Sequence, residues 1–305
     1  MDPTSLNSPQ AAEIQPAGWS LEEILRLSLA VFLRKFLVLA VPAFLAFTVL
    51  SFVDIALMAV LAKTGMTDKA GFCVRWIVSS ALGMVCFGVA IGAIGRAVFC
   101  DLSGQSAGLK SILQTAWQKI IPLTAATFLY HLVVLLPAIP GVGMLWWSTR
   151  LSMDQRLLPA LACILVAGIL LYWPFRLFLQ MIFFAFPVVE EGKGGWAALF
   201  RSRELIRKPG AGGMTGNSMF RVFVVLHVSL MPALVVLFMA CIPVVMMVVV
   251  YSWDQLMEDI NGHRITLPYL ILQALNVIMM TLIMPIFVVP LAVVYQDICK
   301  RMAKT

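Results

Sequence analysis

Apolar residues in this chain are gathered into six long runs, separated by shorter polar segments. The runs cover residues 37–62, 76–99, 121–147, 158–188, 220–250 and 267–297. Each reaches the roughly 20 residues that a helix needs to cross a bilayer. The pattern predicts an all-α fold, a polytopic membrane bundle of six transmembrane helices in a single domain, residues 19–305.

The third run is the least regular of the six. Pro137, Pro140, Gly141 and Gly143 interrupt it. Membrane helices tolerate proline where neighbouring groups satisfy the freed carbonyls. The sequence therefore leaves open whether this span is complete, ends early or re-enters.

The start of the ordered chain carries a helix signal. Residues 1–18 are rich in Pro, Ser, Gln and Asn and lack Lys and Arg, which predicts a disordered tail. Ser20 and Glu23 then have the spacing of a capping box, and Trp19 is placed to pack on Ile24. The polar and apolar positions that follow share opposite arcs, so we expect a helix in the membrane interface that leads into the first span.

Similar segments precede the first, third and fifth spans. They are LEEILRLSLAVFLRKF from Leu21, GLKSILQTAWQKIIPL from Gly108 and GGWAALFRSRELIRKP from Gly194, which repeat with a period of about 87 residues. This favours three hairpin units, each preceded by a cytoplasmic interfacial helix. The alternative is that any protein of membrane hairpins has basic amphipathic linkers.

Basic residues are distributed unevenly between the two sides of the predicted bundle. With the N-terminus in the cytoplasm, fifteen of them fall inside: Arg26, Arg34, Lys35, Arg96, Lys110, Lys119, Lys193, Arg201, Arg203, Arg207, Lys208, Arg221, Lys300, Arg301 and Lys304. Six fall outside: Lys63, Lys69, Arg75, Arg150, Arg156 and Arg264. Positively charged loops stay inside, so we expect a multi-pass protein of a prokaryotic cytoplasmic (inner) membrane with both termini in the cytoplasm.

Composition narrows the class of protein further. Hydrophobic residues make up 61% of the 305 and charged residues 12%, far from the values of a soluble domain. The net charge of +7 resides at the ends of the apolar runs, where it sets orientation and can contact anionic lipid, which argues against a nucleic-acid partner. Six cysteines without a CxxC pair predict neither a metal site nor disulfides.

Small residues recur on one face of the second span. Ala81, Gly88, Gly92 and Gly95 follow one another at spacings of seven, four and three. Gly88 and Gly92 match the small-xxx-small pattern that lets helix backbones approach closely. We expect this face to pack against a neighbouring helix.

Arg176 is the one basic residue well inside a predicted span. Counted from residue 188 it lies about 18 Å deep along a continuous helix, where an unpaired charge is costly. Tyr130 and His131 are expected at a similar depth, and Asp54 is the one acid within a span. These four residues are a candidate intramembrane polar site. The alternative is an arginine that reaches the surface or bonds to carbonyls freed by proline.

A second set of charged residues is expected on the cytoplasmic side. Glu190, Glu191 and Asp297 could pair there with Arg201 and Arg203. Arg203 shares a helical face with apolar residues, so it would otherwise enter an apolar contact. The alternative is a solvated basic end that holds the topology or touches anionic lipid.

Short motifs near the fourth span resemble a known family. They are Phe186-Pro187-Val188-Val189-Glu190-Glu191-Gly192 and Ala197-Ala198-Leu199-Phe200-Arg201-Ser202, with a similar opening at Trp19 to Phe36 and closing at Val294-Tyr295-Gln296-Asp297. They are similar to a bacterial and archaeal six-helix membrane family of uncharacterised activity, which includes the membrane domain fused to some glycerophosphodiester phosphodiesterases. The Gly-rich stretch from Pro209 to Ser218 departs from that pattern, and we expect no phosphodiesterase domain here. The resemblance implies the fold and little about chemistry.

The sequence offers no catalytic, cofactor or metal motif. His131, His227 and His263 lie far apart, without partners at helical spacing. We therefore expect a non-enzyme, either an accessory subunit or organiser of a membrane assembly or of lipid, or a permease for a lipid-like or apolar solute. A permease needs a polar path near mid-membrane, for which the surroundings of Arg176 are the candidate.

Overall fold

The computed structural model describes residues 19–66, 69–153, 156–207, 217–252, 254, 258 and 265–303. These residues form helices and no strand. Six helical stretches are long and apolar enough to cross a membrane: Leu21–Thr64, Ala70–Leu102, Ile120–Met153, Leu157–Glu190, Ser218–Met246 and Leu267–Met302. The predicted all-α membrane fold is confirmed. The tail predicted for residues 1–18 lies outside the described residues.

Helix α1 (Leu21–Thr64) begins as the sequence predicts and contains one kink. Ser20 accepts from the Glu23 amide, and Glu23 accepts from the Ser20 amide, which completes the capping box. The kink is at Lys35, whose backbone leaves helical geometry (φ −115°, ψ 16°). It divides α1 into a first part, residues 21–34, and a long second part.

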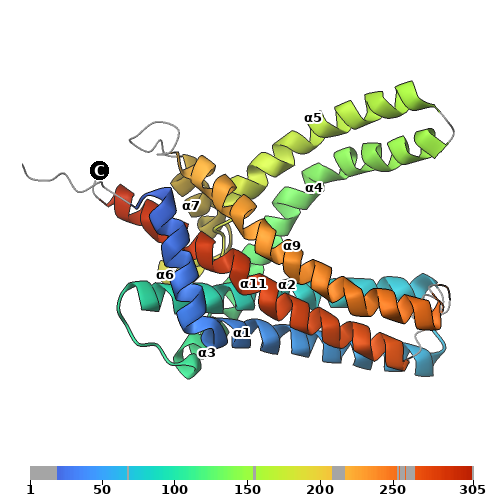
Figure 1. Ribbon diagram of the computed structural model, residues 1–305, viewed down its shortest axis with the longest axis horizontal. Coiled ribbons are helices and arrows are strands. Elements are labelled where there is room, and N and C mark those ends of the chain that lie inside the picture. Colours follow the sequence, from blue (N-terminus) through green and yellow to red (C-terminus); the bar gives the residue numbers. More distant parts are fainter. Residues whose placement is uncertain are drawn as a thin grey trace, which may run out of the picture.

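Four long helices run side by side in a bundle (Figure 1). They are the second part of α1, α2 (Lys69–Leu102), α9 (Ser218–Tyr251) and α11 (Leu267–Met302). Helices α4 (Ile120–Met153) and α5 (Leu157–Met181) form a hairpin that diverges from this bundle. The short helices α3 (Leu109–Gln118), α6 (Phe186–Glu190) and α7 (Gly195–Arg207) gather where the hairpin and the bundle meet, at the end opposite the α4–α5 turn.

The third span is continuous, and the break falls in the fourth. Helix α4 runs through Pro137 and Pro140, and Gly141 lets α5 approach, since a Cβ there would lie 2.6 Å from Leu171 Cγ. In the fourth span the helix stops at Met181, turns over residues 182–185 and resumes as α6. Pro187 has no N–H to continue the helical ladder at this point.

A serine from α7 supports this break. The Ser202 hydroxyl donates to the Gln180 carbonyl at 3.1 Å and accepts from the Phe183 amide at 3.1 Å. Ser202 is completely buried. Backbone groups freed inside a membrane bundle need such partners, because water is absent.

Aromatic side chains fill the core around the break. Phe183 and Phe186 pack with Phe99 of α2 and Tyr295 of α11, at ring-centroid distances of 5.5 to 5.9 Å. All four are buried. The broken segment therefore joins α2, α7 and α11 into one core.

Three of the four predicted small residues form a packing face. A Cβ on Gly88 would lie 2.3 Å from Thr127 Oγ1 of α4, and one on Gly95 would lie 2.9 Å from the Phe186 ring. A Cβ on Gly92 would meet Leu123 at 2.9 Å. The inclusion of Ala81 was wrong: it is exposed, because α4 diverges from α2 beyond this contact.

Candidate functional site

Asp297 of α11 is the centre of a buried charge network at the end of the bundle where α1 begins. Its Oδ2 accepts from Arg221 Nη1 of α9 at 2.7 Å and from Arg301 Nε at 3.0 Å. Its Oδ1 accepts from the Trp19 amide at 2.7 Å. Because Asp297 is completely buried, these donors replace its hydration.

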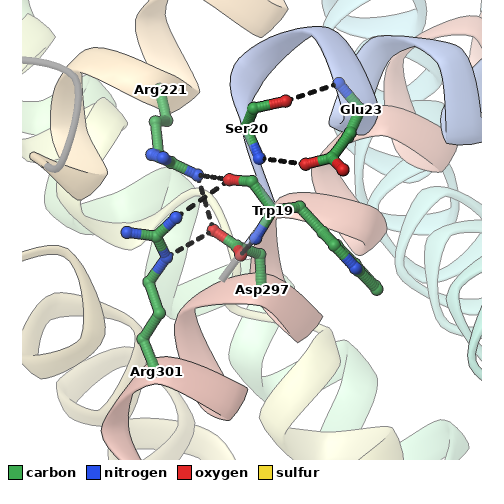
Figure 2. A network of polar contacts seen from close by, with 6 residues as sticks. All are labelled: Trp19, Ser20, Glu23, Arg221, Asp297 and Arg301. Carbon is green, nitrogen blue, oxygen red and sulfur yellow. Dashed lines mark hydrogen bonds and ion pairs between the residues drawn. The ribbon is translucent and has the colours of Figure 1, made fainter. Parts of the chain in front are cut away.

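The same network fixes the start of α1 (Figure 2). The Trp19 carbonyl accepts from Arg221 Nη1 at 2.8 Å and from Arg301 Nη2 at 2.9 Å. The Lys300 ammonium lies 4.2 Å from the centre of the Trp19 ring. The capping box at Ser20 follows directly, so the network holds the first part of α1 against α9 and α11.

Glu191 is the centre of a second network, after α6. It pairs with Arg201 of α7 and with Lys193, each at 3.0 Å, and accepts from the Tyr295 hydroxyl at 2.7 Å. Burial alone would raise the pKa of Glu191, but the hydrogen bonds from Tyr295, Lys193 and Arg201 outweigh it and lower the pKa below the usual glutamate value. The sequence placed Glu191 and Arg201 in one candidate set, and in the structure the two side chains pair.

Two further contacts close the end of α6. Arg96 of α2 pairs with Glu190 at 3.0 Å. Lys119, just before α4, donates to the carbonyls of Val188 at 3.0 Å and Val189 at 2.8 Å. A cation here satisfies carbonyls that the helix end leaves free.

The remaining members of the predicted cytoplasmic set have other surroundings. Asp297 pairs with Arg221 and Arg301, not with Arg201 or Arg203. Arg203 Nε is buried without a hydrogen-bond partner among the described residues. No ion pair joins Arg203 to these acids in the described part of the chain; Arg201, on the same helix, is the residue that pairs with Glu191.

A third polar cluster lies near the opposite end of the bundle. Asp54 of α1 accepts two hydrogen bonds from Arg75 of α2, at 3.0 and 2.8 Å, and one from Ser79 at 2.8 Å. Tyr269 of α11 donates to the same carboxylate, and Gln273 donates at 3.1 Å. The cluster joins three helices and satisfies its one acid internally.

The structure does not bring the four predicted intramembrane residues together. Asp54 is bound to Arg75, and Tyr130 stacks on Phe184 at 4.5 Å with His131 against its edge at 5.4 Å. His131 Nδ1 lies 2.7 Å from the Thr127 carbonyl. Arg176 is exposed, and no acceptor for it is found among the described residues. Because α5 ends at Met181, Arg176 lies about 7.5 Å from the end of its helix, not 18 Å from a continuous one.

Two partners in these clusters were missed by the sequence reasoning. Arg75 had been assigned to an outer loop, but it lies inside α2. Asp54 lies ten residues before the end of α1 at Thr64, and Arg75 lies six residues after the start of α2 at Lys69. The geometry of a helical hairpin would have placed the two at a similar depth. For Arg221 no comparable signal exists, because its partner is 76 residues away.

The contacts within these clusters hold helices together. Their carboxylates accept from arginine, lysine, tyrosine and backbone donors, and they pair helices that are distant in sequence. Among the described residues there is no group of three His, Cys, Asp or Glu side chains that could hold a metal. Comparison with known proteins adds no relative: no family model, curated protein or solved structure matches the chain.

Proposed function

We propose that this chain is a non-catalytic accessory subunit of a membrane assembly, which docks on another membrane protein through α5. The exposed face of α5 that ends at Arg176 carries this proposal. Ala160, Ala167 and Pro174 are buried along one side of α5, and the Ala167 carbonyl on this side lies next to Gly141 of α4. Arg176 lies on the other side of the helix.

The docking face of α5 is defined by Leu158, Leu165, Ile169, Tyr172 and Arg176. The first four side chains are 64 to 81% exposed, and Arg176 continues their line by one turn. Lipid can cover the apolar part of such a face. An arginine is costly to leave in lipid without an acceptor, although less so toward a helix end than at mid-membrane. An acceptor on a second protein would remove that cost.

The internal clusters fit an accessory role better than a permease. Asp54, the one acid that the sequence places well inside a span, is bound to Arg75, Ser79, Tyr269 and Gln273. Tyr130, His131 and Arg176 do not form, together with Asp54, a polar path through the membrane. No observation on the described residues favours the permease for a lipid-like or apolar solute.

The experiment is purification in mild detergent with mass spectrometry of the proteins that accompany the chain. We expect a stoichiometric membrane-protein partner. Arg176→Met should lose this partner while the helical circular dichroism and the melting temperature stay unchanged. Arg156→Met, a control at the other end of α5, should keep it. A pure monomer with bound lipid would contradict the accessory role and favour the permease.

The repeat and the interfacial helices belong to the same proposal. The first part of α1, α3 and α7 bury equivalent positions: Ile24, Ile112 and Ala198, then Ser28, Ala116 and Ser202 one turn later. Lys35 and Lys119, where the first two of these helices meet the next helix, have similar backbone angles, φ −115° and −103° with ψ 16° in both. This supports three units that each place a short helix before a membrane hairpin.

Orientation in the inner membrane is proposed from the basic residues. The fifteen-to-six distribution favours both termini in the cytoplasm. Reporter fusions after Thr305 and near Asp259 should score cytoplasmic and external respectively. An external C-terminus would reverse the orientation and place α3, α6 and α7 outside.

A further inference from the structure

A groove lies between the first part of α1, α9 and α11. Its volume is about 760 Å³. Apolar side chains make most of its wall, among them Leu25 and Phe32 of α1, Val228 and Pro232 of α9, and Ile286 and Pro290 of α11. This size and lining are typical of sites for small apolar ligands.

The groove has charged residues on the α1 side. Glu22 and Arg26 are one helical turn apart on its wall, and both are exposed. Neither forms a hydrogen bond or an ion pair with the residues that the structure describes. One acid and one base are therefore available together beside an apolar wall.

A serine that is largely buried also lines the groove. Ser229 of α9 is 5% exposed, and its hydroxyl has no hydrogen-bond partner in the described part of the chain. Ser28, on the opposite wall, donates to its own helix at the Ile24 carbonyl. The Ser229 oxygen is not one of the fully buried side-chain atoms that lack a partner, so the hydroxyl can be reached from the groove and can donate to a ligand.

The apolar wall reaches membrane depth. Ile286 and Pro290 precede the end of α11 at Met302 by sixteen and twelve residues, which is about 24 and 18 Å of helix. Glu22 and Arg26 lie on the amphipathic first part of α1. A ligand of the groove therefore has a charged end beside α1 and a long apolar part beside α9 and α11.

We propose that the groove binds a zwitterionic phospholipid with a primary ammonium, taken from the bilayer leaflet in which α1 begins. Arg26 binds the phosphate, Glu22 binds the ammonium, and Ser229 donates to an ester carbonyl. An anionic phospholipid without an ammonium would leave Glu22 unpaired beside the phosphate. This inference goes beyond the accessory role and uses other helices than the α5 docking face.

The test is native mass spectrometry of the full chain in mild detergent, with dioleoyl phosphatidylethanolamine or dioleoyl phosphatidylglycerol added. We expect phosphatidylethanolamine to bind about tenfold more tightly, the effect of one charge-assisted hydrogen bond. Glu22→Gln should remove this preference for phosphatidylethanolamine, and Arg26→Gln should weaken the binding of both lipids. Both substitutions are at exposed positions.

A groove-filling variant locates the site. The Ser229→Leu variant should lose the binding of both lipids. The Val235→Leu variant, changed at an exposed position of α9, should bind both lipids with the affinity of the unchanged protein. Equal affinity of the unchanged protein for the two lipids would overturn the proposal. An unchanged preference in Glu22→Gln, or full binding by Ser229→Leu, would overturn it as well.

Discussion

The Asp54 carboxylate and the Arg75 guanidinium face each other across α1 and α2 with two hydrogen bonds of 3.0 and 2.8 Å. Both side chains are nearly buried, at 11 and 13% exposure. Removing one partner of a buried pair leaves an uncompensated charge and costs about 3–5 kcal/mol. Arg75→Met should lower the free energy of unfolding by about this amount, measured by thermal or denaturant unfolding in detergent.

The double variant separates pairing from packing. Asp54→Asn combined with Arg75→Met should be more stable than Arg75→Met alone, because no carboxylate remains unpaired. Additive losses from the two substitutions would show that the pair is not coupled.

The glycine face of α2 predicts a contrast between two alanine substitutions. Gly88→Ala places a Cβ 2.3 Å from Thr127 Oγ1 and 3.3 Å from the Leu123 carbonyl, so Thr127 must give up its present position or α2 and α4 must separate, at about 1–3 kcal/mol for overpacking. Gly83→Ala meets its nearest atom at 3.8 Å and should be neutral or slightly stabilising, because alanine favours helix. Equal melting temperatures for the two variants would contradict this close contact.

Asp297 should hold the start of α1 in place. Asp297→Asn removes the carboxylate that accepts from Arg221 and Arg301, and weakens the contact to the Trp19 amide. We expect a loss of about 3–5 kcal/mol and faster hydrogen exchange in residues 21–34. Asp101→Asn, which removes the more exposed pair with Arg34, should leave exchange in the rest of this segment unchanged.

Glu191 should make stability depend on pH. Its pKa is lower in the folded chain than in the unfolded chain, where the pKa of a glutamate is about 4.3. Its contribution is therefore complete above that pH and is lost as the pH falls through the lower folded value. Glu191→Gln should be less stable at pH 7, and the difference from the unchanged protein should shrink below about pH 4.

A matched acid provides the control for Glu191. Glu204 also pairs with Arg201 at 3.0 Å, but its side chain is 49% exposed. Glu204→Gln should change stability by no more than about 1 kcal/mol. A pH dependence equal to that of Glu191→Gln would show that the Glu191 network is not the source.

The sequence predicts most of this fold because hydrophobicity and length determine the spans. The sixth span was expected at residues 267–297, and α11 covers Leu267–Met302. The start of α1 was predicted from Ser20 and Glu23, because a capping box is a local signal.

Features that depend on tertiary contacts were not predicted. The break at residues 182–185 lies in a continuous apolar run, and Ser202, about twenty residues later, supports it. Arg221 reaches Asp297 only because α9 packs beside α11. Arg176 was expected to find an acceptor within the bundle, but α5 diverges from it.

The most direct test of the accessory role is photo-crosslinking in intact membranes from the docking face of α5. A photoreactive residue in place of Tyr172 should give a discrete adduct with one other membrane protein. The same residue in place of Val235 of α9, which is exposed to a similar extent, should give none. Absence of a protein adduct from position 172, or the same adducts from both positions, would contradict docking through α5.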